Sequence, residues 1–258
     1  MLPGSSPNSI YCPLGARAGS PGTRYPGAVR KDRAMQRRRF SREGAEFGRG
    51  LGFFDAIYGF AITLLVANIE LPPEEEWASL STLLGHGFGT QLLGFAISFV
   101  VIAAFWRYNT ELLSRFSGID QAVITANLFS AGLIVLLPFT TQGISEYSDS
   151  PLPVALYACN VALAILAQAV TLEVGRFRGL LAELVTPATI RAEWIDSLAK
   201  VAVFAVSIPV AYLVSPGWGM TVWLLLAVVG PVTGRWSARV AERERERERG
   251  DRSGAPRA

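Results

Sequence analysis

Residues 53–71 read FFDAIYGFAITLLVANIEL, and the only charged side chains in this run are Asp55 and Glu70. An almost unbroken apolar run of about 20 residues is the length that a helix needs to cross the hydrocarbon core of a bilayer. A surface helix of a soluble protein would instead carry charged residues along a whole face. The run therefore predicts a membrane-spanning helix.

Five further runs of the same kind follow along the chain. They cover residues 90–107, 120–138, 152–173, 198–214 and 218–234. Their residues are continuously apolar and do not alternate with polar ones, which excludes the strands of a membrane β-barrel. The whole chain is 50% hydrophobic and 17% charged, whereas soluble domains carry about a quarter charged residues. We predict an all-α membrane protein with six spanning helices.

The charges of the connecting segments predict the orientation in the membrane. Nine arginines and Lys31 precede the first run, and the loop after it carries Glu74, Glu75 and Glu76 with no lysine or arginine. Basic and acidic connections continue to alternate along the chain. Because basic loops stay in the cytoplasm, both termini are expected to be cytoplasmic.

The ends of the chain differ in composition from the apolar zone. Residues 1–48 are basic and rich in Gly, Pro and Ser, so we expect a disordered tail with no apolar core of a secretory leader. Residues 49–235 form the predicted transmembrane domain. Residues 236–258 form a charged tail, in which Glu and Arg alternate over 242–249. These opposite charges cancel, which favours a solvated segment over one that binds nucleic acid.

Composition argues against most enzyme classes. The chain has two cysteines, Cys12 and Cys159, and one histidine, His86. It therefore lacks the ligands of the usual zinc and di-iron sites. No phosphate-binding glycine loop and no nucleophile–base pair is present. We expect no enzyme activity, no metal site and no cofactor.

Asp55 is an ionisable group inside a predicted span, near its cytoplasmic start. Such groups are expensive in a membrane and are commonly functional. One interpretation is structural: the carboxylate caps the helix or pairs with Arg49 or Arg107. The other is that it holds a helix–helix network or lies on an ion path.

The first span also carries a distinctive stripe. Ala56, Phe60, Thr63 and Ala67 are spaced i, i+4, i+7 and i+11, which places them on one face of a helix. Small and hydroxyl residues on one face suit close helix packing or the wall of a narrow pore. Glu70, at the outer end, would form a ring that concentrates cations in a symmetric oligomer, and would be a solvated helix end in a monomer.

Several motifs of the chain together resemble the transmembrane protein 175 family, a domain of unknown function in bacteria. RGLGFFD at residues 49–55 is similar to that family's Arg-x-x-x-Phe-Ser-Asp signature. The stretch AIYGFAITLLVANIELP follows, as in the family's first helix. SFVVIAAFW, ANLFSAGLIVLLPF, GISEY and SIPVAYLVSP match later helices in order. The resemblance covers about residues 45–235.

The resemblance implies a potassium-permeable cation channel in the cell membrane. Bacterial members have six helices per subunit and assemble as homotetramers, with the first helix lining the pore; animal relatives also leak protons. Matched by position, the hydrophobic constriction falls on Phe60, the hydroxyl layer on Thr63 and the next pore layer on Ala67. With this match, we favour pore lining over packing for the stripe. The implied partners are potassium ions, with sodium or protons as alternatives, and the lipid bilayer.

The resemblance also implies a structural network at the cytoplasmic end of the pore. Arg49, Phe53 and Asp55 carry the signature, with Trp106 and Asn127 as expected neighbours. The chain departs from the family where the signature serine is Phe54, where an aliphatic constriction is the aromatic Phe60, and where paired histidines are Tyr108-Asn109. Two rivals remain: a proton-permeable channel or proton-coupled transporter that uses Asp55, and a non-conducting membrane protein plugged by Phe60.

Overall fold

The computed structural model describes residues 39–85, 87–182 and 185–254. Within them lie six helical spans long and apolar enough to cross a membrane. The single elements are α1 (Ala45–Ala67), α3 (Phe88–Ser114), α6 (Pro151–Phe177) and α7 (Pro187–Leu213). Two composite spans join α4 (Gln121–Val135) to α5 (Leu137–Glu146), and α8 (Pro216–Thr221) and η3 (Val222–Leu225) to α9 (Leu226–Gly254). The prediction of six spans is confirmed.

Most helices are longer than the apolar runs that predict them. Helix α1 begins at Ala45 and not at residue 53, and α7 begins at Pro187 and not at residue 198. The added turns contain charged residues, among them Arg49, Glu193 and Asp196. Hydropathy detects only the part of a helix that matches the hydrocarbon core, so it misses turns that continue beyond it.

The third span bends at a proline. Helix α4 ends at Val135, with Leu136 as its C-cap, and α5 starts at Leu137, with Pro138 in its first turn. Proline is accepted there because the first turn of a helix leaves its N–H groups unbonded in any case. The helical span therefore continues to Glu146, past the predicted end at residue 138.

Two short strands join the ends of α1 and α3. Strand β1 (Arg39–Ser41) pairs antiparallel with β2 (Gly118–Asp120), with Phe40 opposite Ile119. Residues 39–48 are thus ordered, unlike the disordered tail expected there, whereas residues 1–38 lie outside the described part. Beyond β2, the Asp120 carboxylate accepts hydrogen bonds from the backbone N–H groups of Ala122 and Val123 and caps α4.

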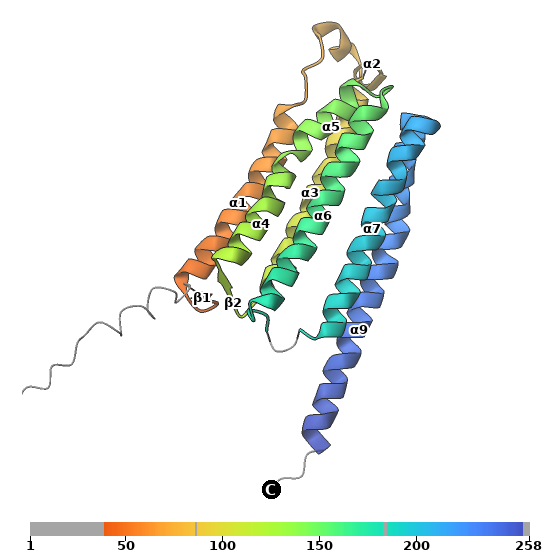
Figure 1. Cartoon of the computed structure of the whole chain (residues 1–258). Helices are drawn as coiled ribbons and strands as arrows, with labels where there is room; N and C mark the ends of the chain where they lie inside the picture. The colour runs from red at the N-terminus through yellow and green to blue at the C-terminus, as the bar shows by residue number, and fades with distance from the viewer. Residues whose placement is uncertain (1–38, 86, 183–184, 255–258) are drawn as a thin grey trace, which may run out of the picture. The chain divides into compact units, whose positions relative to one another are not determined.

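Helix α6 lies at the centre of the helical unit and packs against α4, α5 and α7 (Figure 1). Helix α1 packs against α3 and α4, and α7 packs against α8, η3 and α9. Two clusters of buried hydrophobic side chains stabilise this packing of the helices. One surrounds Tyr58, Ile102 and Phe204, and the other surrounds Phe54, Phe116 and Leu172.

The last helix continues well beyond the sixth apolar run. Helix α9 contains Pro231 and stays helical through Gly254 (Figure 1). Residues 236–254, expected as a separate charged tail, are therefore an extension of the sixth span. η2 (Glu74–Ala78) and α2 (Leu80–Gly85) form the connection between α1 and α3. His86 falls in a gap of the described residues.

Candidate functional site

Helix α1 has one buried face and one exposed face. Phe54, Tyr58, Ala61 and Leu65 are buried in the core. The opposite face carries the predicted stripe, and all four of its side chains are exposed: Ala56, Phe60, Thr63 and Ala67. The exposed fraction of Phe60 is 62%. This set is called the α1 stripe below.

The α1 stripe owes its position to the spacing of the bulky residues on the other face. Tyr58, Ala61 and Leu65 follow the i, i+3, i+7 pattern that turns them toward α3, α4 and α6. Gly59 lies beside the stripe, and a Cβ added there would meet no heavy atom within 4 Å. One chain therefore leaves room along α1 for other helices to approach closely.

The Thr63 hydroxyl is oriented by its own helix. Its Oγ1 donates to the backbone carbonyl of Phe60 at 2.7 Å. A hydroxyl has one proton and two acceptor lone pairs. Because the proton is engaged by the helix, the lone pairs of an exposed Thr63 remain available to a cation.

Asp55 is bonded to α3. Its Oδ1 accepts a hydrogen bond from Trp106 Nε1 at 2.8 Å. Asp55 is ten residues into α1, whose N-cap is Gly44, so the expectation that the carboxylate caps the helix is wrong. Among the ion pairs of the described residues, none joins Asp55 to Arg49 or Arg107. The structure supports the helix–helix interpretation of this carboxylate over the arginine pair.

The signature phenylalanines divide between core and surface. Phe54, which stands where the family has serine, is only 2% exposed and packs in the cluster around Phe116. Phe53 is 56% exposed, and its ring meets that of Phe54 edge to face at 6.0 Å. Arg49 is exposed on the first turns of α1, near the two phenylalanines in sequence. The Phe54 ring thus replaces a hydroxyl by core packing, directed away from the α1 stripe.

Asn127 lies within α4 and is 1% exposed. Neither its Oδ1 nor its Nδ2 has a hydrogen-bond partner in the part of the chain that the structure describes, and the structure does not link it to Asp55. A different buried amide, that of Gln168, forms hydrogen bonds between helices. Its Nε2 donates to Tyr58 Oη at 3.4 Å and to the Phe105 carbonyl at 3.3 Å, so α6 is joined to α1 and α3.

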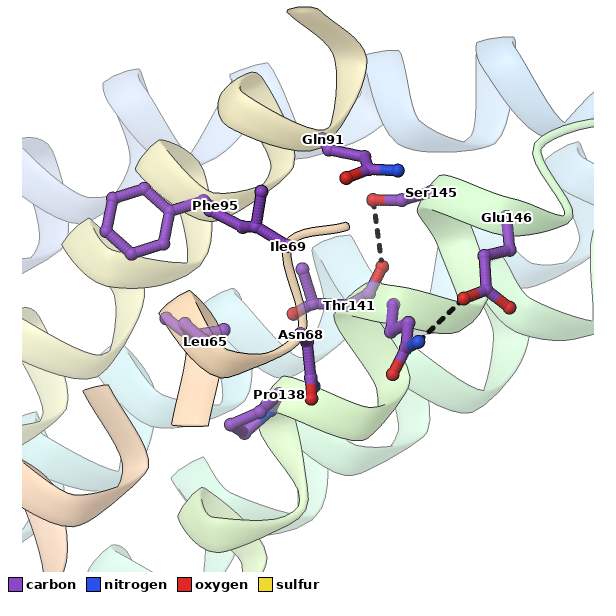
Figure 2. Close-up of a pocket in the computed structure, with 10 residues that line it drawn as sticks. Leu65, Asn68, Ile69, Gln91, Phe95, Pro138, Thr141, Ser145 and Glu146 are labelled. Atoms are coloured by element: carbon purple, nitrogen blue, oxygen red, sulfur yellow. Dashed lines mark hydrogen bonds between the residues drawn. The ribbon is translucent and has the colours of Figure 1, made fainter. Parts of the chain in front are cut away.

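Glu70 follows the end of α1 at the opposite end of the bundle. Its side chain is exposed, and its backbone N–H donates to Gln91 Oε1 at 3.1 Å. Figure 2 shows the small cavity beside it, between α1, α3 and α5, where Gln142 donates to Glu146 at 2.6 Å. The backbone at Glu70 is therefore anchored to α3 while its carboxylate remains exposed.

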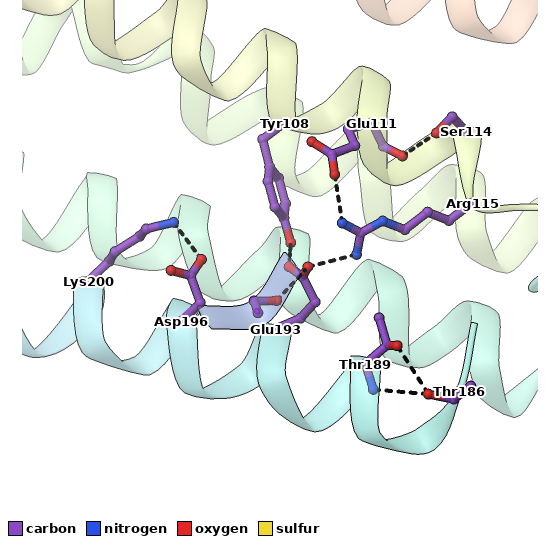
Figure 3. A network of polar contacts seen from close by, with 10 residues as sticks. Tyr108, Glu111, Ser114, Arg115, Thr186, Thr189, Glu193, Asp196 and Lys200 are labelled. Carbon is purple, nitrogen blue, oxygen red and sulfur yellow. Dashed lines mark hydrogen bonds and ion pairs between the residues drawn. The ribbon is translucent and has the colours of Figure 1, made fainter. Parts of the chain in front are cut away.

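A second polar group, which the sequence analysis missed, joins α3, α7 and α9 (Figure 3). Glu193, 7% exposed, accepts a hydrogen bond from Tyr108 Oη at 2.9 Å and pairs with Arg115 at 2.9 Å. The Ser237 hydroxyl of α9 donates to the same carboxylate at 3.3 Å. One turn further along α7, Asp196 pairs with Lys200 at 2.5 Å and accepts from Thr233 of α9. This set is called the α7 network below.

The charges of the α7 network support one another. Burial alone would lower the pKa of the Arg115 guanidinium, but the carboxylates of Glu193 and Glu111 outweigh it and raise that pKa. Arg115 therefore stays charged and holds Glu193 and Glu111 together at the end of α3. A signal for this network was present in the sequence, since Glu193, Asp196 and Lys200 are spaced i, i+3 and i+7 and share one helix face.

Comparison with known proteins matches the first half of the transmembrane zone to one family. Residues 49–138 match the family model described as TMEM175, endosomal/lysosomal potassium channel TMEM175. A potassium channel of Streptomyces collinus is 30% identical over 132 residues, which are 48% of this chain and 62% of that protein. A potassium channel of Chryseobacterium sp. is 25% identical over 120 residues, 46% of this chain and 60% of that protein.

Another relative is the endosomal/lysosomal proton channel TMEM175 of mouse, 29% identical over 139 residues, 52% of this chain and 26% of that protein. Among solved structures, the lysosomal potassium-selective channel TMEM175 homolog of Chamaesiphon minutus matches with a TM-score of 0.60 at 22% identity. That match covers 75% of this chain and 98% of the other and shows a shared fold. The chain spans about three fifths of the length of the two bacterial relatives.

Proposed function

We propose that the chain is a member of the TMEM175 family that its first transmembrane segments match, and that it is a potassium-permeable cation channel whose pore is lined by α1. The family and its relatives are channels and not enzymes, so the prediction that the chain is no enzyme is confirmed. The six spans and the family match also confirm a multi-pass integral membrane protein. Potassium conduction, a gate on α1 and assembly into a homotetramer are the further parts of what we propose.

The observation that carries the proposal is the bare α1 stripe. An apolar face exposed to lipid needs no particular residues, but this face combines small side chains, one hydroxyl and one phenyl ring at helical spacing. In a homotetramer, four such stripes would enclose a narrow path. The transmembrane domain of this channel would be residues 49–235, with both chain ends on the cytoplasmic side, where the basic segments lie.

Phe60 would form the gate of this pore. A ring of four phenyl groups makes a hydrophobic constriction that excludes water and resists ion entry. One turn further, the Thr63 hydroxyls would replace part of the hydration shell of an ion that has passed. Side-chain hydroxyls form a less rigid cage than a filter of backbone carbonyls, so moderate selectivity for potassium is expected. Ala67 would line the wider part above.

The ends of the pore would have separate roles. Phe53, Arg49 and the Asp55–Trp106 hydrogen bond would fix the cytoplasmic end of α1 against α3. Glu70, anchored through its backbone to Gln91, would form an outer ring that attracts cations. A proton-permeable channel or proton-coupled carrier remains the second candidate, because the Asp55 carboxylate lies inside a span and is exposed.

The proposal is tested by ion flux through the purified protein in liposomes, under a potassium gradient and then a sodium gradient. Potassium flux should exceed sodium flux, and it should rise in Phe60→Ala. Phe99→Ala is the matched control, because Phe99 is also exposed within a span but lies on α3. An unchanged flux in Phe60→Ala would contradict the assignment of Phe60 as the gate. Ion flux that occurs only under a proton gradient would favour the proton-coupled carrier.

A further inference from the structure

Three adjoining cavities follow α3 on the side that faces α7 and α9. Their volumes are about 650, 210 and 550 Å³. The first and second share Val101, Phe204 and Leu226 of their linings. The second and third share Tyr108, Asp196, Lys200 and Gly230. They therefore adjoin one another along α3, and together they are called the α3–α9 cleft below.

The cleft has the length of a membrane and changes polarity along it. Its α3 lining starts at Thr90 and ends at Arg115, which at 1.5 Å per residue is about 37 Å. Toward the Thr90 end its walls are mostly apolar, as at Leu93, Ile97 and Leu224. Toward the Arg115 end they are mostly charged or hydroxyl-bearing. A cleft that is apolar at hydrocarbon depth and charged at one membrane surface matches the shape of a lipid.

The charged end of the cleft contains one cation and one anion outside the α7 network. Arg115 and Lys200 are engaged by Glu111, Glu193 and Asp196. The remaining two ionised groups of the lining, Arg107 and Glu242, are both exposed and take part in no ion pair among the described residues. One basic and one acidic group on the same rim complement a ligand that itself carries one negative and one positive charge.

We propose that the α3–α9 cleft binds a phospholipid with a zwitterionic, amine-bearing headgroup. Its phosphate would lie against the Arg107 guanidinium, and its ammonium group would lie toward Glu242. An acyl chain would fill the apolar part of the cleft between Ala104 and Gly230. An empty apolar cleft loses dispersion contacts that a flexible chain restores, and a headgroup without an amine would leave the Glu242 carboxylate without a partner. The proposal does not depend on ion conduction.

Native mass spectrometry of the full chain tests this proposal. The protein is purified in detergent, stripped of lipid and given equal amounts of phosphatidylethanolamine and phosphatidylglycerol with identical chains. Bound phosphatidylethanolamine should exceed bound phosphatidylglycerol about fivefold, the scale of one well-placed charge contact. Glu242→Gln should remove that preference, and Arg107→Gln should weaken both adducts. Arg191→Gln, an exposed charge on α7 outside the cleft lining, should change neither.

A second pair of variants tests the apolar part. Ala104→Trp fills the cleft and should lower both lipid adducts about tenfold or more, whereas Ala205→Trp, at an exposed alanine of α7 outside the cleft lining, should leave them unchanged. Equal adducts in the two tryptophan variants would overturn the proposal. So would loss of the oligomer in Ala104→Trp alone, since a second copy of the chain would then occupy the cleft. If Ala104→Trp fails to fold, the headgroup variants decide, and no preference between the two lipids overturns the proposal.

Discussion

Replacing Glu193 by alanine removes the centre of the α7 network. The substitution deletes the ion pair with Arg115 at 2.9 Å, the acceptor of the Tyr108 hydroxyl at 2.9 Å and the acceptor of the Ser237 hydroxyl at 3.3 Å. Helices α3, α7 and α9 meet at this one carboxylate (Figure 3). Its loss should therefore loosen the only described set of side-chain hydrogen bonds that joins all three helices.

The size of the effect follows from burial. Removing one partner of a buried ion pair costs about 3–5 kcal/mol, because the other charge stays buried without compensation. Arg115 keeps its pair with Glu111, and its side chain is 18% exposed, so we expect a smaller loss of about 2–3 kcal/mol. For a chain of this size, that corresponds to a fall in melting temperature of about 4–12 °C.

Thermal unfolding in detergent measures the change. Glu193→Gln keeps an oxygen that accepts from Tyr108, so it should lose about half as much as Glu193→Ala. Glu173→Ala is the control, since Glu173 pairs with Arg176 at a site where the arginine side chain is 44% exposed, and exposed pairs contribute about 0–1 kcal/mol. Equal melting temperatures for Glu193→Ala and Glu173→Ala would refute the reasoning.

Three further substitutions probe other contacts. Gly175→Ala places a Cβ 2.2 Å from the buried ring of Phe116, so it should destabilise the protein by about 1–3 kcal/mol in the same thermal assay; a change within error would mean that the ring moves freely. Trp106→Phe removes the donor to Asp55 while keeping an aromatic ring, and it should lower the free energy of unfolding by about 1–3 kcal/mol. An unchanged stability would show that this hydrogen bond contributes nothing. Thr63→Val keeps the shape of the side chain but deletes its oxygen, so the ratio of potassium to sodium flux should fall toward one; an unaltered ratio in liposomes would rule out a hydroxyl layer at this position.

The sequence predicts the number of spans well, because each span needs a long apolar run and the chain has six. It predicts helix ends poorly. The first turns of α7 carry Arg191, Glu193 and Asp196, so a hydropathy pattern treats them as a loop, although burial in the α7 network stabilises them as helix. The three-residue strands β1 and β2 are also missed, since strands that short have no periodicity to detect.

The candidate site divides in the same way. The spacing of Ala56, Phe60, Thr63 and Ala67 identifies one helix face without any structure, because side chains within one helix have fixed directions. The hydrogen bond between Asp55 and Trp106 joins residues 51 apart in the chain. That contact depends on how α1 and α3 pack, so residue spacing alone could not assign the partner of Asp55.

The central claim is that the α1 stripe faces an ion path, and cysteine accessibility tests it most directly. In a background in which Cys12 and Cys159, the two native cysteines, are replaced, Ala67→Cys places a thiol on the stripe and Ala61→Cys places one on the buried face of α1. A membrane-impermeant cationic thiol reagent should block potassium flux in Ala67→Cys and leave Ala61→Cys unaffected. Flux that persists in Ala67→Cys after the thiol is shown to have reacted would contradict a pore lined by α1.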